Sequence, residues 1–261
     1  MIMNSDGILY MSFGAKAANA IVKSVASLRK LRLDFPVCVV GTSPVKDMQF
    51  IPWTGENPFD TGQRHNFQFR AGRIKPRLYK VSPFERTLYI DADTVFMKSI
   101  QEGFNLLDEY DIAVTEENLT LAQLYNKKLA GWEINIQERD ITVIETGGNA
   151  SKKFINSGVI FFRKNIQTEK LFDDWHSEWM RFQQWDEQLA LMRAIHNNQD
   201  VKIKHLSVEW NHPHLDRRAI IFHNYGRGVV RMNVARPDPH PALPQIREER
   251  PNLGEEGTVN I

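Results

Sequence analysis

The chain has 261 residues, of which 42% are hydrophobic and 25% are charged, a composition typical of a globular protein. The net charge of +1 argues against nucleic acid or an anionic membrane as a partner, so any anionic ligand must be held by local groups. A lone cysteine, Cys38, excludes an intrachain disulfide and a cysteine-based zinc site.

The N-terminal sequence MIMNSDGILYMSFG has neither a basic start nor a long apolar run, and no segment approaches the length of a membrane span. We therefore expect a cytoplasmic protein without a signal peptide or a membrane segment.

The first part of the chain alternates between strand and helix patterns. An apolar run at residues 8–11 predicts a strand, apolar spacings of three and four predict a helix over 21–31, and residues 35–41 predict a buried strand. Such alternation indicates a parallel sheet. Residues 47–72, with several prolines and glycines, are expected to form a loop.

The remaining elements follow in the same way. We expect helices over 75–81, 99–108, 168–182 and 186–196, and strands over 87–90, 111–115, 154–162, 201–210 and 219–223. Residues 119–149 show poor patterning. The aromatic stripe of 168–182 is expected to pack in the core. Five prolines and many charges beyond Ala235 predict one domain over 1–235 and a flexible tail over 236–261.

One motif carries most of the chemical information. The apolar strand TLYI runs directly into Asp91 and Asp93, which point to the same side of an extended chain, while Ala92 faces away. Two adjacent carboxylates repel each other unless a cation or a shared proton lies between them. Transfer from a metal-bound diphosphate and formation of an aspartyl-phosphate both use this arrangement. An acidic turn or helix start is the structural alternative.

The rest of the chain helps to choose among these chemistries. In a haloacid-dehalogenase-like phosphatase, Asp91 would be the nucleophile and Asp93 the general acid, but there the motif normally opens the domain. Here a strand–helix–strand unit precedes it. A sugar-phosphate nucleotidyltransferase is disfavoured because no glycine-rich basic loop follows the first strand. A non-catalytic binding module is disfavoured because Asp91, Asp93, Asp186 and His223 occur together.

Four motifs in order resemble the GT-A-fold glycosyltransferases, nearest to the glycogenin-like retaining group. They are IKPRLYKVSPFERTLYIDADT at 74–94, FINSGVIFF at 154–162, WDEQLAL at 185–191 and FHNYGRG at 222–228. The resemblance covers about residues 7–231. It implies an α/β fold with a mixed, mostly parallel sheet flanked by helices and a Rossmann-like nucleotide-binding half. It further implies sugar transfer from a nucleotide-sugar, most commonly a UDP-sugar, with retention of configuration; the acceptor is unknown.

The resemblance assigns a divalent metal ion to Asp91, Asp93 and His223. One imidazole nitrogen with several oxygens suits Mn²⁺, with Mg²⁺ as the alternative. A cation that bridges two phosphate oxygens stabilises the leaving diphosphate. The small Ala92 leaves room for the ribose and the backbone to approach. For His223, a hydrogen-bonded histidine at a strand end is the structural alternative.

The resemblance also implies a set of donor-binding residues: Ser12, Phe13, Gly14, Lys75, Ala92, Asn156, Ser157, Gly158, Gln188, Gly226 and Arg227. Two alternatives stay open. Lys75 can be a solvated charge at a helix start, and the Asn-Ser-Gly segment can be a β-bulge. The family carries a lysine shortly after the last motif where this chain has Val229, so phosphate neutralisation falls to Arg227 or Arg231.

The WDEQ motif is expected to lie beneath the donor sugar. A carboxylate there can attack the anomeric carbon or stabilise an oxocarbenium-like centre. Glycogenin-like enzymes carry glutamine where Glu187 falls, whereas blood-group-type transferases carry an Asp-Glu pair. We predict Glu187 as nucleophile or charge stabiliser and Asp186 as the group that holds the sugar hydroxyls, with helix capping as the alternative for Asp186.

Overall fold

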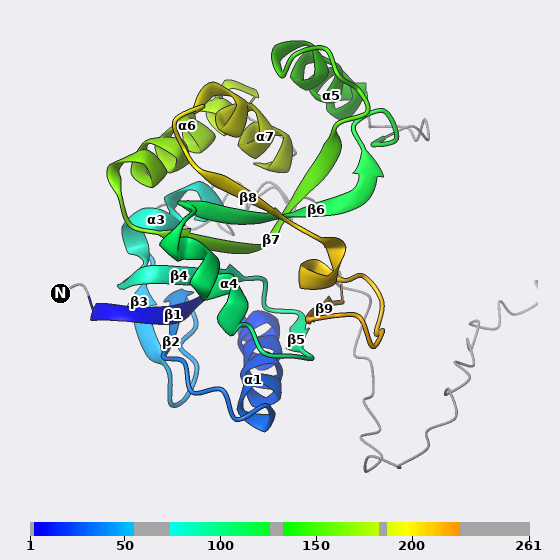
Figure 1. Cartoon of the computed structure of the whole chain (residues 1–261). Helices are drawn as coiled ribbons and strands as arrows, with labels where there is room; N and C mark the ends of the chain where they lie inside the picture. The colour runs from blue at the N-terminus through cyan, green and yellow to red at the C-terminus, as the bar shows by residue number, and fades with distance from the viewer. Residues whose placement is uncertain (1–2, 55–73, 126–132, 183–186, 225–261) are drawn as a thin grey trace, which may run out of the picture. The chain divides into compact units, whose positions relative to one another are not determined.

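Figure 1 shows the computed structural model, which describes residues 3–54, 74–125, 133–182 and 187–224. The elements are β1 (Met3–Ser12), α1 (Ala15–Lys30), β2 (Val37–Gly41), β3 (Gln49–Pro52), η1 (Lys75–Arg77), α3 (Leu78–Val81), β4 (Phe84–Ile90), β5 (Thr94–Phe96), α4 (Gln101–Asn105), η2 (Leu106–Asp108), β6 (Ile112–Thr120), α5 (Glu133–Glu145), β7 (Lys153–Arg163), α6 (Ile166–Phe182), α7 (Glu187–Asn197), β8 (Ile203–Leu206), η3 (Val208–Asn211) and β9 (Ile221–His223). Within these ranges, no helix combines the length and the hydropathy needed to cross a membrane.

Seven strands form one mixed sheet in the order β3-β2-β1-β4-β7-β6-β8. β1 runs parallel to β2 and β4, and β3 runs parallel to β2. β7 runs antiparallel to β4 and β6, and β8 runs parallel to β6. The carboxyl ends of β1, β2 and β4 therefore meet at one edge, where open α/β sheets bind their ligands. The predicted mixed, mostly parallel sheet is confirmed.

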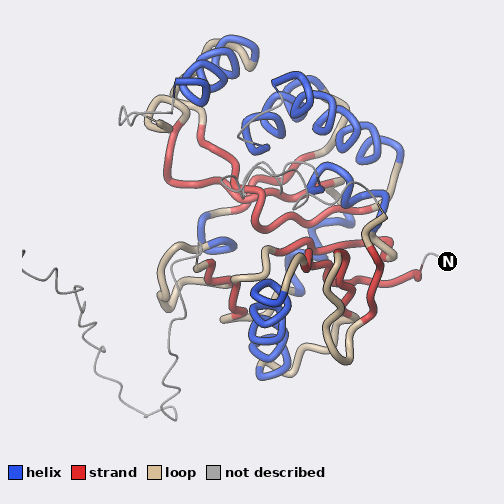
Figure 2. Tube along the Cα trace, turned by 180° about the vertical axis from the view of Figure 1, so that it is seen from behind, coloured by secondary structure: helices blue, strands red, loops and turns tan. Residues whose placement is uncertain are grey.

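Helices cover both faces of this sheet, as the two opposite views show (Figures 1 and 2). Ile8 and Tyr10 share a core with α1 and α4, whereas Leu9, between them, shares a core with α3, α6 and α7. Strands that are buried on both faces read as continuous apolar runs. This explains why the run VCVV in β2 could be recognised as a buried strand from its sequence.

The aromatic stripe on α6 packs in the core, as predicted. Leu171, Phe172, Trp175 and Trp179 are buried. The rings of Phe172 and Trp175 meet edge to face at 5.5 Å. Each such side chain stabilises the fold by roughly 1.5–3 kcal/mol through burial, so the stripe needs no ligand to explain it.

Several predicted elements differ from the structure. The predicted helix over 75–81 is a 3₁₀ turn, η1, followed by a short α-helix, α3. The predicted loop at 47–72 begins with a short strand, β3, which pairs along β2. The predicted helix over 99–108 is a short α-helix, α4, followed by a 3₁₀ turn, η2. The predicted strand over 201–210 ends at Leu206, and a 3₁₀ turn, η3, follows it. In the last two cases the apolar spacing correctly predicted a helix and a strand, but it did not show where each changes into a 3₁₀ turn.

Helix α5 lies in the region whose patterning was poor. Its buried side chains are polar, namely Asn135, Glu138 and Thr142, whereas Ile134 and Ile144 are exposed. A helix with its polar residues inward does not show the apolar stripe on which sequence-based recognition relies. The predicted tail at 236–261 lies outside the described residues, and the boundary at 235 stays a prediction.

Candidate active site

The Asp-x-Asp motif forms a turn at the carboxyl end of β4. After the turn the chain enters β5, which pairs antiparallel with β9 and places Thr94 opposite His223. The backbone amide of Asn224 donates to the carbonyl of Asp93 at 3.0 Å. This two-stranded ribbon brings His223 beside the carboxylates, although Asp93 and His223 are 130 residues apart in sequence.

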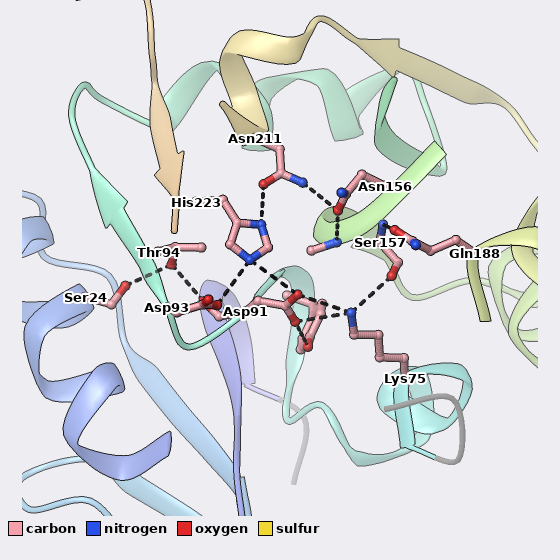
Figure 3. Close-up of polar contacts among 12 residues, drawn as sticks. Ser24, Lys75, Asp91, Asp93, Thr94, Asn156, Ser157, Gln188, Asn211 and His223 are labelled. Atoms are coloured by element: carbon pink, nitrogen blue, oxygen red, sulfur yellow. Dashed lines mark hydrogen bonds and ion pairs between the residues drawn. The ribbon is translucent and has the colours of Figure 1, made fainter. Parts of the chain in front are cut away.

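The three predicted metal ligands lie together (Figure 3). The Nε2 atom of His223 is 3.1 Å from Oδ1 of Asp93 and 3.8 Å from Oδ2 of Asp91. The imidazole is buried, with 6% of its side chain exposed, while the carboxylates of Asp91 and Asp93 are 23% and 33% exposed. The cluster is therefore closed on the histidine side and open to solvent on the carboxylate side.

Buried hydroxyl groups tie the turn to the first strand and helix. Thr94 donates from Oγ1 to the carbonyl of Asp91 at 2.8 Å. Its hydroxyl also lies 3.1 Å from that of Ser24 in α1, which in turn lies 2.8 Å from the phenol oxygen of Tyr10 in β1. The sequence analysis did not identify Thr94, Ser24 or Tyr10, and only the position of the threonine directly after the motif could have indicated a local role.

Lys75 is buried and lies among acidic and polar partners. Its Nζ atom is 3.2 Å from Oδ1 of Asp91 and 3.3 Å from Oε1 of Glu187, and it donates to Oγ of Ser157 at 3.1 Å. Burial alone would lower the pKa of Lys75, but the two carboxylates outweigh burial and raise it. The ammonium group therefore stays charged across the neutral range. The alternative of a solvated lysine is wrong.

Glu187 opens α7 and is buried, with its carboxylate held from two sides. Ser157 donates from Oγ to Oε1 of Glu187 at 2.8 Å, and the same oxygen faces Lys75. The backbone carbonyl of Glu187 accepts from the indole of Trp175 at 2.6 Å. Gln188 accepts the backbone amide of Ser157 at 3.1 Å. These contacts fix the start of α7 against β7; Asp186 lies outside the described residues.

Tyr89 is a further member of this cluster that the sequence analysis missed. Its phenol donates to Asp91, and Nζ of Lys75 lies 5.6 Å from the centre of its ring. Burial, followed by the charge of Asp91, raises the pKa of Tyr89 well above its ordinary value, so the phenol remains a donor. The sequence position of Tyr89 could have identified it, because it precedes Asp91 by two residues and so lies on the same side of the strand.

The Asn-Ser-Gly segment of β7 is a β-bulge. Val114 pairs with Ile160, but the next residue of β6 pairs with Asn156, so β7 has extra residues at this point. Oδ1 of Asn156 accepts the backbone amide of Gly158 at 2.8 Å. The bulge alternative is confirmed, and contacts of Asn156, Ser157 and Gly158 with a donor sugar stay predictions.

Because Gly158 has no side chain, the predicted metal ligands His223 and Asp91 can lie close to β7. A Cβ atom at this position would lie 2.7 Å from Cε1 of His223 and 3.0 Å from Oδ2 of Asp91. The backbone carbonyl of Gly158 accepts the amide of Asp91 at 2.9 Å. A glycine is therefore needed where β7 passes directly behind both side chains.

The predicted nucleotide-binding residues lie at the carboxyl ends of β1 and β4. Ser12 is buried at the end of β1, and Gly14 has a φ of 86° just before α1. Phe13 is half-buried and meets Trp53 edge to face at 6.4 Å. Ala92 is half-buried between the carboxylates. The remaining predicted donor residues, Gly226 and Arg227, and also Arg231, lie outside the described residues.

The cluster has the chemistry of a cation site. The carboxylates of Asp91 and Glu187 face the single ammonium group of Lys75, and that of Asp93 faces His223, so negative charge is in excess. Adjacent ligands of an octahedral ion with bonds of about 2.1 Å lie about 3 Å apart, close to the separation of His223 from Asp93. Asp91 lies further from His223, and among the described residues no group of three or more His, Cys, Asp or Glu side chains is arranged so that it could hold a metal ion. One imidazole and two carboxylates are donor types that a divalent metal binds, and metal binding here stays a prediction.

Comparisons with known proteins point to sugar transfer. The sequence profile of the nucleotide-diphospho-sugar transferase family matches residues 86–210. The galactosyltransferase LgtC, solved with donor and acceptor sugar analogues, is similar with a TM-score of 0.52 and 14% identity, over 84% of this chain and 86% of that one. A sequence search of curated proteins finds no match.

Two further solved structures share the fold. The bifunctional glycosyltransferase WbbM, in its apo form, gives a TM-score of 0.57 at 13% identity and covers 87% of this chain, which spans 47% of that one. Apo mouse xyloside xylosyltransferase 1 gives a TM-score of 0.50 at 13% identity, over 79% and 87% of the two chains. The fold is thus the GT-A glycosyltransferase fold, and together with the profile match it supports glycosyltransferase activity. The narrower resemblance to the glycogenin-like group stays a prediction.

Proposed function

We propose that this chain is a metal-dependent glycosyltransferase that moves a sugar from a nucleoside-diphosphate sugar to an acceptor with retention of configuration. The observation that carries the proposal is the meeting of Asp91, Asp93 and His223 at the carboxyl end of β4, beside the buried pair of Lys75 and Glu187. A hard cation and a sugar-facing carboxylate are the two groups that such a transfer needs.

Asp91, Asp93 and His223 would hold Mn²⁺, or Mg²⁺ as the alternative. When bound, the metal supplies charge stabilisation to the diphosphate as it leaves. The carboxylates face solvent and are therefore accessible to a phosphate-bearing ligand, whereas the imidazole is fixed from behind. Lys75 holds Asp91 in place and keeps the excess negative charge of the cluster from forcing the carboxylates apart.

We assign Glu187 as a stabiliser of positive charge on the sugar. Oε1 of Glu187 accepts from Ser157 and faces Lys75, so the electron pairs of that oxygen are already engaged, which weakens it as a nucleophile. The same contacts fix the carboxylate and avoid a reorganisation cost during the reaction. Asp186 would hold the hydroxyls of the donor sugar.

The phosphatase alternative fits less well. It requires Asp91 to attack phosphorus, but Asp91 accepts the phenol of Tyr89 and lies against Lys75. The GT-A fold also differs from the arrangement in which the Asp motif opens the domain. No observation on the described residues favours that function over sugar transfer.

A panel of nucleotide-sugars, each with and without Mn²⁺, tests the donor class by thermal shift, because a specific ligand raises the melting temperature. We expect a UDP-sugar to stabilise the chain only with the metal. Proton NMR of the product from an α-linked donor then tests the stereochemistry. An α-linked product supports retention, and a β-linked product contradicts it.

A further inference from the structure

A line of hydrogen-bonded amides runs behind His223, on the side away from the carboxylates (Figure 3). It begins at Glu117 in β6, passes through Asn156 in the β7 bulge and Asn211 in η3, and ends at Nδ1 of His223. Asn156, Asn211 and His223 are each at least nine-tenths buried. At this depth each donor must face an acceptor, because an unpaired polar group is costly in the protein interior.

The backbone amide of Gly158 sets the direction of the whole line. It can only donate, so the Asn156 side-chain atom that lies 2.8 Å from it must be the oxygen, Oδ1. The other end of the same amide faces a carboxylate oxygen of Glu117, which accepts and therefore requires the nitrogen, Nδ2. Both ends of Asn156 give the same orientation.

The orientation of Asn156 then determines that of Asn211. Because Oδ1 of Asn156 accepts, the Asn211 atom that lies 2.7 Å from it must be the donor Nδ2. The remaining oxygen, Oδ1 of Asn211, faces Nδ1 of His223 at 2.8 Å. An amide oxygen can only accept, so Nδ1 of His223 carries a proton. On the other side of the ring, Nε2 lies 3.1 Å from Oδ1 of Asp93, and in the metal-free chain a proton lies between these two atoms.

We propose that Asn211 is a positioning residue that keeps a proton on Nδ1 of His223, so that Nε2, which faces Asp91 and Asp93, is the nitrogen that gives up its proton when a metal ion binds. The inference rests on the proposed function for its purpose, because an imidazole binds a metal through an unprotonated nitrogen. Its structural content, the location of the proton on Nδ1, does not depend on whether a metal binds.

Nitrogen-15 NMR of histidine-labelled protein tests the location of this proton directly. The full chain is measured without metal and with Mg²⁺, and the signals of His223 are identified by their loss in His223→Gln. We expect Nδ1 to carry a proton in both samples. An unprotonated Nδ1 in the wild-type protein overturns the inference, and this result needs no Asn211 variant.

Substitutions at Asn211 test its positioning role through Mn²⁺ affinity, measured by electron paramagnetic resonance of the free ion. Asn211→Ala removes the acceptor, and we expect affinity to fall about 10- to 100-fold, as for other groups that orient a metal-bound histidine. Asn211→Asp keeps an acceptor opposite Nδ1 but loses the donor to Asn156, so it should lower stability and yet retain more Mn²⁺ affinity than Asn211→Ala. Asn198→Ala removes an equally buried asparagine, which contacts Asp174 and Lys170, and should leave Mn²⁺ affinity unchanged.

The outcomes separate the positioning role from the proposed function. If the wild type binds Mn²⁺ and Asn211→Ala binds it equally well with the proton still on Nδ1, Asn211 does not position His223. If the wild type binds no Mn²⁺, the metal-dependent function fails, and the NMR result alone decides the inference. An equal loss of Mn²⁺ affinity in Asn198→Ala and Asn211→Ala would mean that both substitutions act only by destabilising the fold. That result also overturns the positioning role of Asn211.

Discussion

Two buried cations, Arg193 in α7 and Lys75 in η1, lie in opposite kinds of surroundings. Arg193 lies between Glu138 of α5 and Glu178 of α6, at 3.0 and 2.8 Å, and donates to the hydroxyl of Thr142 at 2.6 Å. Its side chain is 1% exposed, and that of Glu138 is 3% exposed. This cluster joins three helices and has no exposed carboxylate on Glu138 for a ligand to reach.

The Lys75 cluster is built from the same kinds of groups but is left open. The side chain of Lys75 is also buried, at 6% exposed, yet that of Asp91 is 23% exposed and lies next to Asp93 and His223. The raised pKa of Lys75 keeps it charged, so this ion pairing is present at neutral pH, and on the alkaline side it is lost when the pH rises through that raised pKa. A fully buried ion pair, such as that of Arg193, therefore does not by itself indicate a functional site. A buried cation whose carboxylate partners carry excess negative charge and partly face solvent, such as Lys75, does indicate one.

The largest effect on stability is expected when the closed cluster is broken. Arg193→Met leaves Glu138 buried without its cation, and we expect the free energy of unfolding to fall by about 3–5 kcal/mol. Urea unfolding measures this loss. Arg181→Met is the matched control, because Arg181 also contacts Glu178 but is 46% exposed, and it should cost less than about 1 kcal/mol. Equal losses in both variants would show that burial of the pair does not matter.

Glu187→Gln sharpens the comparison within the open cluster. The hydrogen bond from Ser157 can remain, but the negative charge that the proposed function places beside the sugar is lost, so turnover should fall by about 10²-fold with little change in donor KM. Steady-state kinetics with the preferred donor gives both constants. Glu116→Gln, which alters a carboxylate paired with Lys153 and His205, should keep its turnover. Wild-type turnover in Glu187→Gln would reduce that residue to a structural role.

Gly158→Ala is expected to lower stability less than Arg193→Met does, while still disturbing the site. The added methyl group must displace His223 or Asp91, so we expect a loss of about 1–3 kcal/mol together with weaker Mn²⁺ binding. Gly103→Ala is the control, because its methyl group would clash with Phe161, outside the site. It should lose stability but keep its Mn²⁺ affinity. Unfolding and Mn²⁺ titration of both variants separate the loss of stability from the loss of Mn²⁺ affinity. Unchanged Mn²⁺ affinity in Gly158→Ala would show that the close packing of Gly158 against His223 and Asp91 does not matter for metal binding.

Local patterns in the sequence predicted the strands that carry the site. The run before Asp91 reads as a buried strand because both of its faces are covered, and the run from Phe154 to Phe162 does so for the same reason. The order of the motifs was enough to group Asp91, Asp93 and His223. Their grouping depended on resemblance, since no local pattern shows that β9 pairs with β5.

The supporting residues could not be predicted in this way. Asn211 and Thr94 have ordinary polar side chains whose hydrogen bonds reach Asn156 and Ser24, 55 and 70 residues away in the chain. Lys75 could be assigned by resemblance, but its burial depends on how η1 packs beside Glu187. Helix α5 escaped recognition because Arg193 draws its polar face inward toward Glu138 and Thr142.

The most direct test of the open cluster is calorimetry of UDP binding with and without Mn²⁺, in the wild type and in the double variant Asp91→Asn/Asp93→Asn. We expect the wild type to bind UDP only when Mn²⁺ is present. The double variant should lose several kcal/mol of binding free energy while its unfolding remains cooperative, because both anionic ligands are neutralised without a change of shape. Equal UDP affinity in the two proteins would contradict the account.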